Sequence, residues 1–399
     1  MKIWYISKYA NVPTSEGATR HFMLSKSMAN YGHDITLIYS RSNGFKHLRS
    51  FMLFKKQLFD DVKCIMINGP VINLGFNIKR LISWIGFEVK LLFFSITRKS
   101  KKRPDVVIVS SLSLITFLSG IILKKIFKSK LILEVRDIWP DSVIQIGKIS
   151  EHGLIAKVLR WIEKQGYKNA DGIIATMPRF DLYLFEKYGI RTNFKCIPQG
   201  YDKTWINSSE DYIESPFNEK FFNVCYAGTI GRANYVEHLL QAAILLKDTN
   251  IRFYILGNGE MKNKLQEEFC NFSNIIFIDA IPKEYVVKFI SQADLLVHMC
   301  SKHKMYKYGI SPYKWIDYML SGVPILVSYD GYQSIINEAN CGFFIEAENI
   351  DILAKSIYNI SIMDKEQLNK FGQNGKSYVY KHHDYNYLGQ ELLNFIDKC

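Results

Sequence analysis

Short apolar runs alternate with helical segments along almost the whole chain, and this alternation constrains the fold most strongly. The first series of runs is KIWYIS, DITLIYS, CIMI, VVIVS, KLILEV, GIIAT and FKCIP. A second series follows, FFNVCYAG, RFYILG, NIIFID, DLLVHM, PILVS and GFFIE. Runs that are apolar throughout and separated by helices are typical of parallel strands buried on both faces, so the chain is predicted to be an α/β protein. Two series in succession predict two doubly wound domains facing each other across a cleft.

The chain length of 399 residues also favours two domains over one. We place the boundary near PQGYDKTW, residues 198–205, ahead of a polar segment, NSSEDYIESPFNEK. The predicted domains cover residues 1–200 and 201–380, and residues 381–399 are expected to form a C-terminal helix that packs back toward the first domain.

One uncharged run, VVIVSSLSLITFLSGIIL, approaches the length of a transmembrane helix. Its pattern instead predicts a buried strand directly after Pro104 and Asp105, and a helix over residues 114–127. The N-terminus, MKIWYISKYA, lacks the features of a signal peptide. The seven scattered cysteines contain no CxxC pair, which indicates reduced thiols in a cytoplasmic protein.

The positive charge is confined to the first part of the sequence. Residues 1–150 contain 24 Lys and Arg against 9 Asp and Glu, a net +15, whereas residues 151–399 contain 27 against 29, a net −2. Residues 79–103 alone carry eight basic side chains, interleaved with aromatic ones, and one acidic side chain. Such a segment either lies on an anionic membrane surface or is an ordinary solvated helix, and both alternatives stay open.

Two other classes of protein fit the sequence poorly. The region after the first predicted strand contains a single glycine, so the G-x-G-x-x-G fingerprint of an NAD-dependent oxidoreductase is missing. A nucleic-acid partner is not predicted, because the basic excess lies in one domain only and the chain has no recognised nucleic-acid module.

Three loops of the second domain are candidate ligand sites, since ligands of doubly wound sheets bind beyond the carboxyl ends of the strands. The turn in YAGTIGRANYVEHL carries Gly228, Gly231 and Arg232 beside a helix start, which suits a diphosphate, although a plain turn is the alternative. The turn in ILGNGEMKNKL contributes Gly257 and Gly259, which permit close backbone approach.

The third loop is YGISPYKWIDYMLSGVPIL. We expect Ser311 to cap the following helix and Pro312 to occupy its first position, so that the positive end of the helix dipole points into the cleft. Lys314 and Asp317 follow in the first two turns. Asp317 either accepts hydrogen bonds from a ribose diol or is a carboxylate favoured by the helix dipole.

These motifs, in their order and spacing, resemble the retaining glycosyltransferases of family 4, which have the GT-B fold. The resemblance extends over nearly the whole chain and is carried by YISKYANVPTSEGATRHFMLSKSMANYGHDITLI, EVRDIWPDS, IPQGYD, YAGTIGRANYVEHLLQAA, ILGNGEMKNKL and YGISPYKWIDYMLSGVPIL. It is strongest to the bacterial branch that builds O-antigen, capsule or related polysaccharides, including amino-deoxysugar transferases. The resemblance implies transfer of a sugar, with retention, from a UDP-linked donor to an undecaprenyl-diphosphate-linked saccharide at the inner face of the cytoplasmic membrane.

The resemblance also implies roles for individual residues. The family usually has two glutamates eight positions apart around the third loop, where this chain has Gly309 and Asp317. The usual Arg and Lys of the diphosphate turn correspond to Thr229 and Asn234, which leaves Arg232 and Lys314 as candidate cations.

Further candidates come from the other motifs. The loop of Gly17 is expected to approach the donor phosphates, and the backbone of Ile281 to meet the nucleobase. Arg136 and Asp137 would line the reaction centre, with Asp137 either a general base or a structural residue. The full donor-binding set is Gly17, Gly228, Thr229, Gly231, Asn234, Gly257, Ile281, Gly309, Ile310, Ser311 and Asp317; the catalytic candidates are Asp137, Arg232 and Lys314; and the acceptor and membrane candidates are Arg136, Lys99, Lys101 and Lys102.

No metal and no cofactor is predicted, since the chain contains no Asp-x-Asp triplet. Two rival functions remain. A sugar-nucleotide epimerase would have the same fold, and a non-catalytic sugar-binding protein would have two similar domains.

Overall fold

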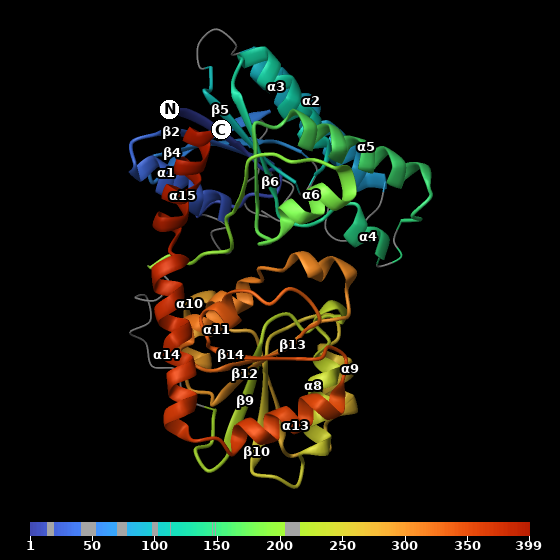
Figure 1. Cartoon of the computed structure of the whole chain (residues 1–399), viewed down its shortest axis with the longest axis vertical. Helices are drawn as coiled ribbons and strands as arrows, with labels where there is room; N and C mark the ends of the chain where they lie inside the picture. The colour runs from blue at the N-terminus through green and yellow to red at the C-terminus, as the bar shows by residue number, and fades with distance from the viewer. Residues whose placement is uncertain are drawn as a thin grey trace. The chain divides into compact units, whose positions relative to one another are not determined.

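The computed structural model describes residues 1–13, 20–40, 53–69, 78–97, 103–111, 113–145, 147, 149–203 and 216–399. The chain forms two compact units, which Figure 1 shows in sequence colours. Unit 1 contains Met1–Pro198 and Tyr385–Cys399, and unit 2 contains Gln199–Asp384.

Unit 1 is built on an eight-stranded sheet in the order β3-β4-β2-β1-β5-β6-β7-β8. Its strands are β1 (Lys2–Ile6), β2 (Asp34–Ser40), β3 (Phe54–Phe59), β4 (Val62–Ile67), β5 (Val106–Ser110), β6 (Lys130–Val135), β7 (Gly172–Ala175) and β8 (Phe194–Cys196). Every pairing except that of β3 with β4 is parallel. The central strand β5 is buried along its whole length, as an apolar run in a sheet covered on both faces requires.

The helices of unit 1 connect these strands and cover the sheet. They are α1 (Arg20–Asn30), α2 (Ile78–Ile96), α3 (Ile115–Phe127), α4 (Asp141–Gln145), α5 (Leu154–Asn169), α6 (Phe180–Tyr188) and α15 (Tyr385–Lys398). Helix α15 packs against α1, so the end of the chain belongs to unit 1.

Unit 2 contains a six-stranded, wholly parallel sheet in the order β11-β10-β9-β12-β13-β14. Its strands are β9 (Phe222–Ala227), β10 (Ile251–Leu256), β11 (Ile275–Ile278), β12 (Leu295–Met299), β13 (Ile325–Ser328) and β14 (Gly342–Ile345). Its helices are α8 (Val236–Leu245), α9 (Lys262–Glu268), α10 (Lys283–Ile290), α11 (Tyr313–Ser321), α12 (Ile335–Glu338), α13 (Ile350–Ser361) and α14 (Lys365–His382), with short 3-10 helices η1 (Arg232–Asn234) and η2 (Lys304–Tyr308).

Two apolar layers sandwich the sheet of unit 2, because successive side chains of a strand point to opposite faces. On one face Val224 and Tyr226 of β9 pack in a cluster with residues of α8 and α13. On the other face Cys225 of β9 packs in a cluster with Trp315 and Ile316 of α11. The two layers fix α8 and α11 on opposite sides of the same strand.

The candidate transmembrane run divides as predicted into β5 and α3. Within the described part of the chain, no helix has both the length and the apolar character needed to cross a bilayer.

Two features depart from the predicted pattern. Strand β3 was not predicted and runs antiparallel to β4, joined to it through Asp60 and Asp61, both of which have positive φ angles of 45° and 63°. Two left-handed residues make a tight hairpin turn, and Asp tolerates this conformation better than most residues. The C-terminal helix expected over residues 381–399 is α15, but it begins four residues later, at Tyr385, because α14 continues to His382.

Candidate functional site

A cavity of about 490 Å³ lies at the carboxyl ends of the central strands of unit 2. The chain adds strands first on one side of β9 and then on the other, so the loops after β9 and β12 diverge and leave a crevice between them. The cavity is lined by Ala227, Gly228, Thr229, Asn234, Leu256, Gly257, Asn258, Ala280, Ile281, Lys283, Val286, His298, Pro312, Tyr313, Lys314 and Asp317.

Glycines allow two loops of this cavity to pack directly against each other. A Cβ atom at Gly257, where φ is +147°, would collide with the carbonyl oxygen of Gly228, and one at Gly259 would collide with the carbonyl oxygen of Ile230. These two glycines therefore allow the loop after β10 to contact the turn after β9 within the protein.

Lys314 supplies a positive charge on the cavity wall. It is the second residue of α11, and its Nζ donates to Asn234 Oδ1 at 2.7 Å and to Tyr226 Oη at 3.0 Å. Gly228 leaves room for the stem of Lys314 in this position, since a Cβ at residue 228 would lie 2.6 Å from Lys314 Cε. Burial lowers the pKa of Lys314 to about 8, because both hydrogen-bond partners are neutral and no carboxylate compensates its charge.

Asp317, one turn further along α11, supplies a carboxylate on the same wall. It forms an ion pair with Lys283, the first residue of the neighbouring helix α10. Burial raises the pKa of Asp317, and the charge of Lys283 opposes this shift. Because Lys283 is the more exposed partner, with 42% of its side chain accessible against 14% for Asp317, the pair presents a carboxylate inside the cavity with its counter-ion at the rim.

His298 of β12 also reaches the cavity wall, and it is neutral. Its Nδ1 accepts a hydrogen bond of 2.9 Å from Trp315 Nε1, so the ring proton is on Nε2. Burial, together with the nearby charge of Lys314, holds the pKa of His298 well below its ordinary value.

Neither Lys283 nor His298 was singled out from the sequence. A histidine within the otherwise apolar run DLLVHM was an available signal, because a polar residue in a buried strand requires a partner. Lys283 follows the run NIIFID and a short turn. No signal distinguished it, because many lysines at such positions are solvated helix residues.

The cavity brings together six of the predicted donor-binding residues and one of the catalytic candidates, Lys314. Gly228, Thr229, Asn234, Gly257, Ile281, Lys314 and Asp317 line it. Arg232 does not line it: the side chain is 83% exposed and lies 3.8 Å from Glu260. Gly231, Gly309 and Ile310 also lie outside the lining, and Gly17 lies outside the described residues.

The expected cap of α11 is wrong by one residue. Pro312 precedes the helix in an extended conformation, with φ −72° and ψ 141°, and the first helical residue is Tyr313. Ser311 does not cap the helix, because its Oγ accepts a 3.0 Å hydrogen bond from the backbone N–H of Gln199 instead. The serine thus joins the segment before α11 to Gln199, the first residue of unit 2.

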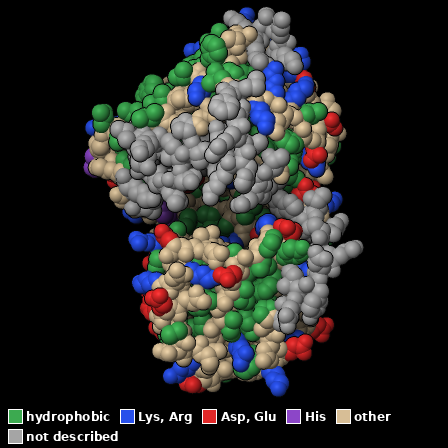
Figure 2. All heavy atoms as spheres, turned by 180° about the vertical axis from the view of Figure 1, so that it is seen from behind, with side chains coloured by type: hydrophobic (Ala, Val, Ile, Leu, Met, Phe, Trp, Pro, Cys, Tyr) green, Lys and Arg blue, Asp and Glu red, His purple; other side chains and the backbone are tan. Residues whose placement is uncertain are grey.

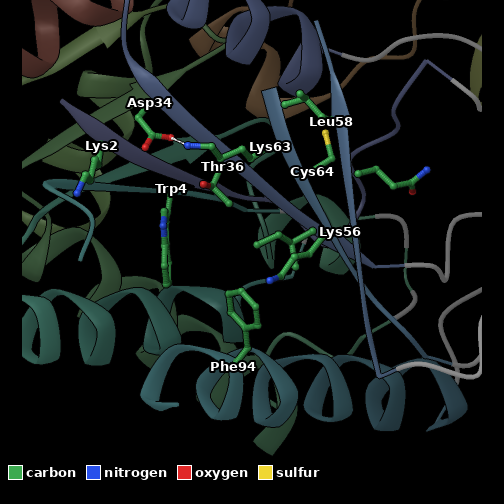
Figure 3. A pocket seen from close by; sticks show the side chains of 11 residues that line it. Lys2, Trp4, Asp34, Thr36, Lys56, Leu58, Lys63, Cys64 and Phe94 are labelled. Carbon is green, nitrogen blue, oxygen red and sulfur yellow. Dashed lines mark hydrogen bonds and ion pairs between the residues drawn. The ribbon is translucent and has the colours of Figure 1, made fainter. Parts of the chain in front are cut away.

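A second cavity, of about 550 Å³, lies in unit 1 between the sheet and α2. Figure 3 shows Phe94 reaching from α2 toward the strands, beside Trp4, and Lys63 pointing to Asp34. Lys2 and Asp34 are the first residues of their strands, so the cavity lies at the amino ends of β1 and β2. Ligands of such sheets bind at the carboxyl ends, which favours the cavity of unit 2 as the functional site.

In unit 1, Arg136 and Asp137 follow β6 at the carboxyl end of the sheet. The carboxylate of Asp137 is exposed and accepts a 3.3 Å hydrogen bond from Ser142 Oγ. The backbone N–H of Arg136 donates to Ser111 Oγ at 3.0 Å, and its buried Nε has no hydrogen-bond partner. Lys99, Lys101 and Lys102 lie outside the described residues.

A fully buried charge network underlies this edge of unit 1. Arg20 Nε donates to Glu134 Oε1 at 2.6 Å, and His21 Nε2 lies 3.1 Å from the other carboxylate oxygen, with no part of the three side chains accessible. Arg20 also donates to the carbonyl oxygen of Ile197 at 2.6 Å and to that of Pro198. The network therefore joins the start of α1, the end of β6 and the last residues before the chain enters unit 2.

The charges of the network depend on one another. The cations around Glu134, chiefly Arg20, outweigh its desolvation and hold its pKa well below the ordinary value. Burial lowers the pKa of His21, and its Nδ1 has no hydrogen-bond partner. The motif EVRD contains Glu134, but only Arg136 and Asp137, which follow the strand, were predicted as site residues.

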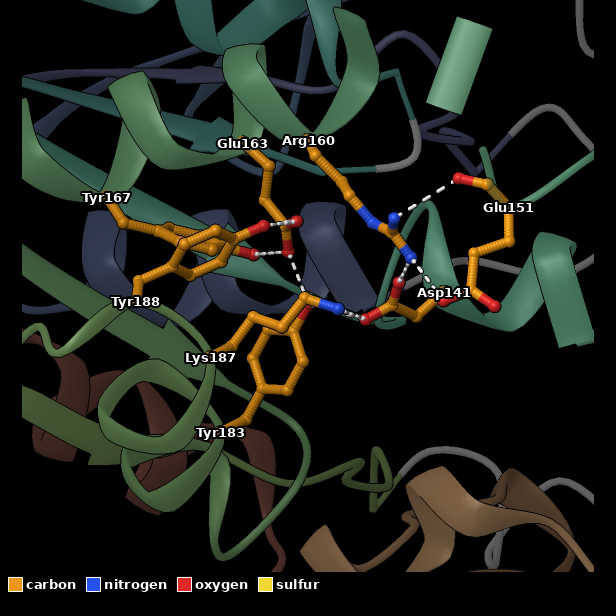
Figure 4. Close-up of polar contacts among 8 residues, drawn as sticks. All are labelled: Asp141, Glu151, Arg160, Glu163, Tyr167, Tyr183, Lys187 and Tyr188. Atoms are coloured by element: carbon orange, nitrogen blue, oxygen red, sulfur yellow. Dashed lines mark hydrogen bonds and ion pairs between the residues drawn. The ribbon is translucent and has the colours of Figure 1, made fainter. Parts of the chain in front are cut away.

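A second polar cluster fixes α4 against α5 and α6 (Figure 4). Asp141, the first residue of α4, accepts from Arg160 at 3.1 Å, from Lys187 at 2.8 Å and from Tyr183 at 3.2 Å. Its pKa is lowered, because hydrogen bonds and charge from these cations outweigh its burial.

Glu163 lies beside this cluster, with its carboxyl group within hydrogen-bond distance of three tyrosine hydroxyls. The hydroxyls of Tyr167 and Tyr183 lie 2.9 Å and 3.0 Å from Oε1, and the hydroxyl of Tyr188 donates to Oε2. Burial raises the pKa of Glu163 to about 8 in spite of these donors. Figure 4 shows the three rings converging on the carboxyl group.

Among the described residues, no group of three His, Cys, Asp or Glu side chains is placed to hold a metal ion.

The fold of the chain is shared with proteins of known structure. Sucrose-phosphate synthase from Thermosynechococcus elongatus superposes on the whole of this chain and on 98% of its own chain, with a TM-score of 0.74 at 15% identity. HepE from Anabaena, solved in complex with UDP-glucose, covers 100% of both chains with a TM-score of 0.66 at 14% identity. The two parallel-sheet units thus have the GT-B architecture of glycosyltransferases.

Sequence comparison gives matches to parts of the chain. Residues 208–378 match the family described as glycosyl transferases group 1. The Escherichia coli K12 protein WcaI, which carries the name of a colanic acid biosynthesis glycosyl transferase, is 23% identical over 200 residues, 48% of this chain and 48% of that protein. The chain therefore spans about half the length of the curated relatives it matches. Residues 208–378 are thus similar in sequence to the group 1 glycosyltransferases.

Proposed function

We propose that the protein is a retaining glycosyltransferase of family 4 that moves a sugar from a UDP-linked donor to a lipid-linked saccharide. The observation that supports this most is the cavity of unit 2, where Lys314 and Asp317 project from one helix at the carboxyl edge of the sheet. A nucleotide sugar carries a negative diphosphate between a ribose diol and the sugar. Lys314 would face the diphosphate, and Asp317, on the same wall of the cavity, would face the ribose diol.

The donor diphosphate would bind beside Lys314 and the turn at Gly228 and Thr229. The start of α11 adds the positive end of a helix dipole, which favours the same charge. Asp317 would accept hydrogen bonds from the ribose hydroxyls, and the backbone near Ile281 would meet the base.

Departure of the diphosphate is the difficult step of the transfer. Charge develops on the leaving oxygens in the transition state, and donors already held in place stabilise it without reorganising. Lys314 is suited to this task because Asn234 and Tyr226 fix its ammonium group before the substrate arrives. In unit 1, Asp137 is the candidate base for the acceptor hydroxyl and Arg136 a candidate acceptor-binding residue.

We further propose that the acceptor is an undecaprenyl-diphosphate-linked saccharide and that the enzyme works in O-antigen or capsule synthesis. It would act peripherally on the inner face of the cytoplasmic membrane. The basic excess of the first 150 residues supports this, since anionic lipids attract such segments by about 1 kcal/mol per Lys or Arg near the surface.

Ligand-induced stabilisation tests the donor site. The purified protein is heated with UDP, UDP-sugars, GDP-sugars and dTDP-sugars, and a donor at a hundredfold excess over its Kd should stabilise the protein by about 2.7 kcal/mol. Lys314→Ala and Asp317→Ala should lose this shift, while Lys264→Ala, on an exposed lysine of α9 outside the cavity, should keep it. An undiminished UDP-sugar shift in both cavity variants would exclude the site.

Product analysis separates the rival functions. A transferase yields a new glycoside only when the lipid-linked acceptor is present, and proton NMR of its anomeric signal reports retention. An epimerase converts the nucleotide sugar without an acceptor, and a binding protein is stabilised by the ligand without converting it.

A further inference from the structure

Three neighbouring helices of unit 1 expose large apolar side chains. Helix α3 contacts α2 on one side and α5 on the other, so their outer faces form one layer over the sheet (Figure 1). We call this surface the α2–α3–α5 face, and Figure 2 shows hydrophobic and basic side chains together on the surface of unit 1. Its exposed apolar residues are Ile82, Ile85, Val89, Phe93, Ile96, Ile122, Leu154, Ile155, Val158 and Trp161.

From residue 82 onward, the exposed side of α2 consists of apolar side chains alone. From Ile82 to Ile96, every exposed side chain is aliphatic or aromatic, and the five of them recur at spacings of three and four residues. This spacing aligns them in one stripe along the helix. The accessible fraction of these side chains runs from 49% to 62%, so the stripe is not covered by the described protein.

Helix α5 adds a second apolar stripe with lysines beside it. Leu154, Val158 and Trp161 are 77%, 47% and 55% exposed. Exposed lysines stand between and after them, at positions 157, 164 and 168. The helix therefore presents an apolar centre flanked by positive charge.

The three helices expose no negative charge. Their sequences contain two carboxylates, Glu88 of α2 and Glu163 of α5, and both are buried. Thr116 and Ser119 of α3 donate to Glu88 at 2.5 Å and 2.6 Å. Glu88 thus joins α2 to α3, while Glu163 is hydrogen-bonded to tyrosines of α5 and α6. The exposed side chains described on the three helices are apolar or basic.

We infer that the α2–α3–α5 face docks the protein on an anionic lipid surface. The apolar side chains would enter the boundary between head groups and acyl chains, and the lysines of α5 would lie among the lipid phosphates. This rests on the proposed function for its purpose, a membrane-embedded acceptor, and extends the expected contact from residues 79–103 to α5. A second copy of the chain fits this face less well, because a symmetric contact would bring the same lysines against one another.

Vesicle co-sedimentation tests the inference on the full chain. An apolar variant carries Val89→Gln, Val158→Gln and Trp161→Gln, and a single Trp161→Gln variant checks the effect with minimal change. A matched control carries Leu245→Gln, Tyr358→Gln and Ile362→Gln, three apolar side chains of unit 2 with similar exposure. A charge variant carries Lys157→Gln, Lys164→Gln and Lys168→Gln.

Vesicles of phosphatidylcholine with phosphatidylglycerol should bind the wild type and the control equally, and the apolar variant at least about tenfold more weakly. Vesicles of phosphatidylcholine alone should bind the wild type more weakly, and the charge variant should lose this preference. Equal binding of the apolar variant, or an equal loss in the control, overturns the inference. So does a wild type that is dimeric without vesicles and becomes monomeric in the apolar variant.

Transfer to a water-soluble acceptor glycoside separates this inference from the proposed function. The apolar variant should transfer sugar to the soluble acceptor at the wild-type rate while failing to bind vesicles. A wild type that binds anionic vesicles but transfers no sugar contradicts the proposed function and supports the docking face.

Discussion

Lys314 Nζ lies 2.7 Å from Asn234 Oδ1, which joins the first turn of α11 to the turn after β9. The ammonium group thus donates a hydrogen bond to a neutral oxygen, and burial lowers the pKa of Lys314 to about 8. A cation that is held in place but not neutralised is the arrangement expected where the missing anion comes from a ligand.

Donor binding should therefore weaken as the pH rises through about 8. Below this pH Lys314 carries the charge that attracts the diphosphate, and above it the free protein must take up a proton in order to bind. The Kd for UDP, measured by calorimetry from pH 6.5 to 9.5, should rise in this range. Lys314→Arg, whose side chain keeps its charge, is expected to remove the dependence, and a flat wild-type profile would contradict the prediction.

Removing the cation should cost affinity more than stability. Lys314→Gln is expected to weaken UDP binding about tenfold to a hundredfold, since hydrogen bonds to charged groups contribute about 1.5–3 kcal/mol. The free protein should be no less stable, because the buried charge is costly there. Lys264→Gln provides the control, and equal losses in both variants would show that charge near the cavity, not this contact, determines affinity.

The pair of Lys283 and Asp317 should determine recognition of the ribose. Asp317→Asn is expected to weaken UDP binding about tenfold while leaving 2′,3′-dideoxy-UDP binding unchanged, because only UDP offers hydroxyls to the carboxylate. Lys283→Met should reduce the same discrimination to a smaller extent, because the carboxylate of Asp317 then lacks the counter-ion that keeps it ionised and in place. Competition binding with the two nucleotides measures the ratio, and a ratio unchanged in Asp317→Asn would exclude a ribose contact.

The sequence predicted the elements of the fold well because most strands are buried on both faces. A buried strand such as β5 is apolar throughout and is recognised without knowledge of its neighbours. Strand β3 was missed because it is an edge strand whose run FKKQLF contains two lysines, and none of its residues is fully buried.

The candidate site was predicted partly from position on one element and partly from the family resemblance, which supplied Thr229, Asn234 and Ile281. Lys314 and Asp317 were found because they follow a helix start after a strand. The partners of buried charges come from distant parts of the chain: Glu134 and Arg20 are 114 positions apart, and Lys283 and Asp317 are 34 apart. Such pairings depend on tertiary packing, which local periodicity does not contain.

Breaking the buried pair of Arg20 and Glu134 should destabilise the protein strongly. Arg20→Met leaves a buried carboxylate without its main counter-charge and is expected to lower the free energy of unfolding by about 3–5 kcal/mol. The added substitution Glu134→Gln should restore part of the loss. Urea unfolding measures both, and Lys26→Met, which breaks a surface pair with Asp60, should cost less than about 1 kcal/mol. A cost for Arg20→Met as small as that of the surface pair would contradict the assignment.

The tyrosine cluster around Glu163 should make stability fall with rising pH. The pKa of Glu163 is about 8 in the folded protein against an ordinary value of 4.5, so between these values the folded state binds the proton more tightly than the unfolded state. Within this window the unfolded state has lost the proton and the folded state keeps it. The free energy of unfolding therefore falls by up to about 1.4 kcal/mol per pH unit. Glu163→Gln, which keeps the neutral form, should gain stability over the wild type as the pH rises from 5 to 8. Urea midpoints across this range measure the difference, and parallel curves for the two proteins would show that Glu163 is already ionised in the folded state.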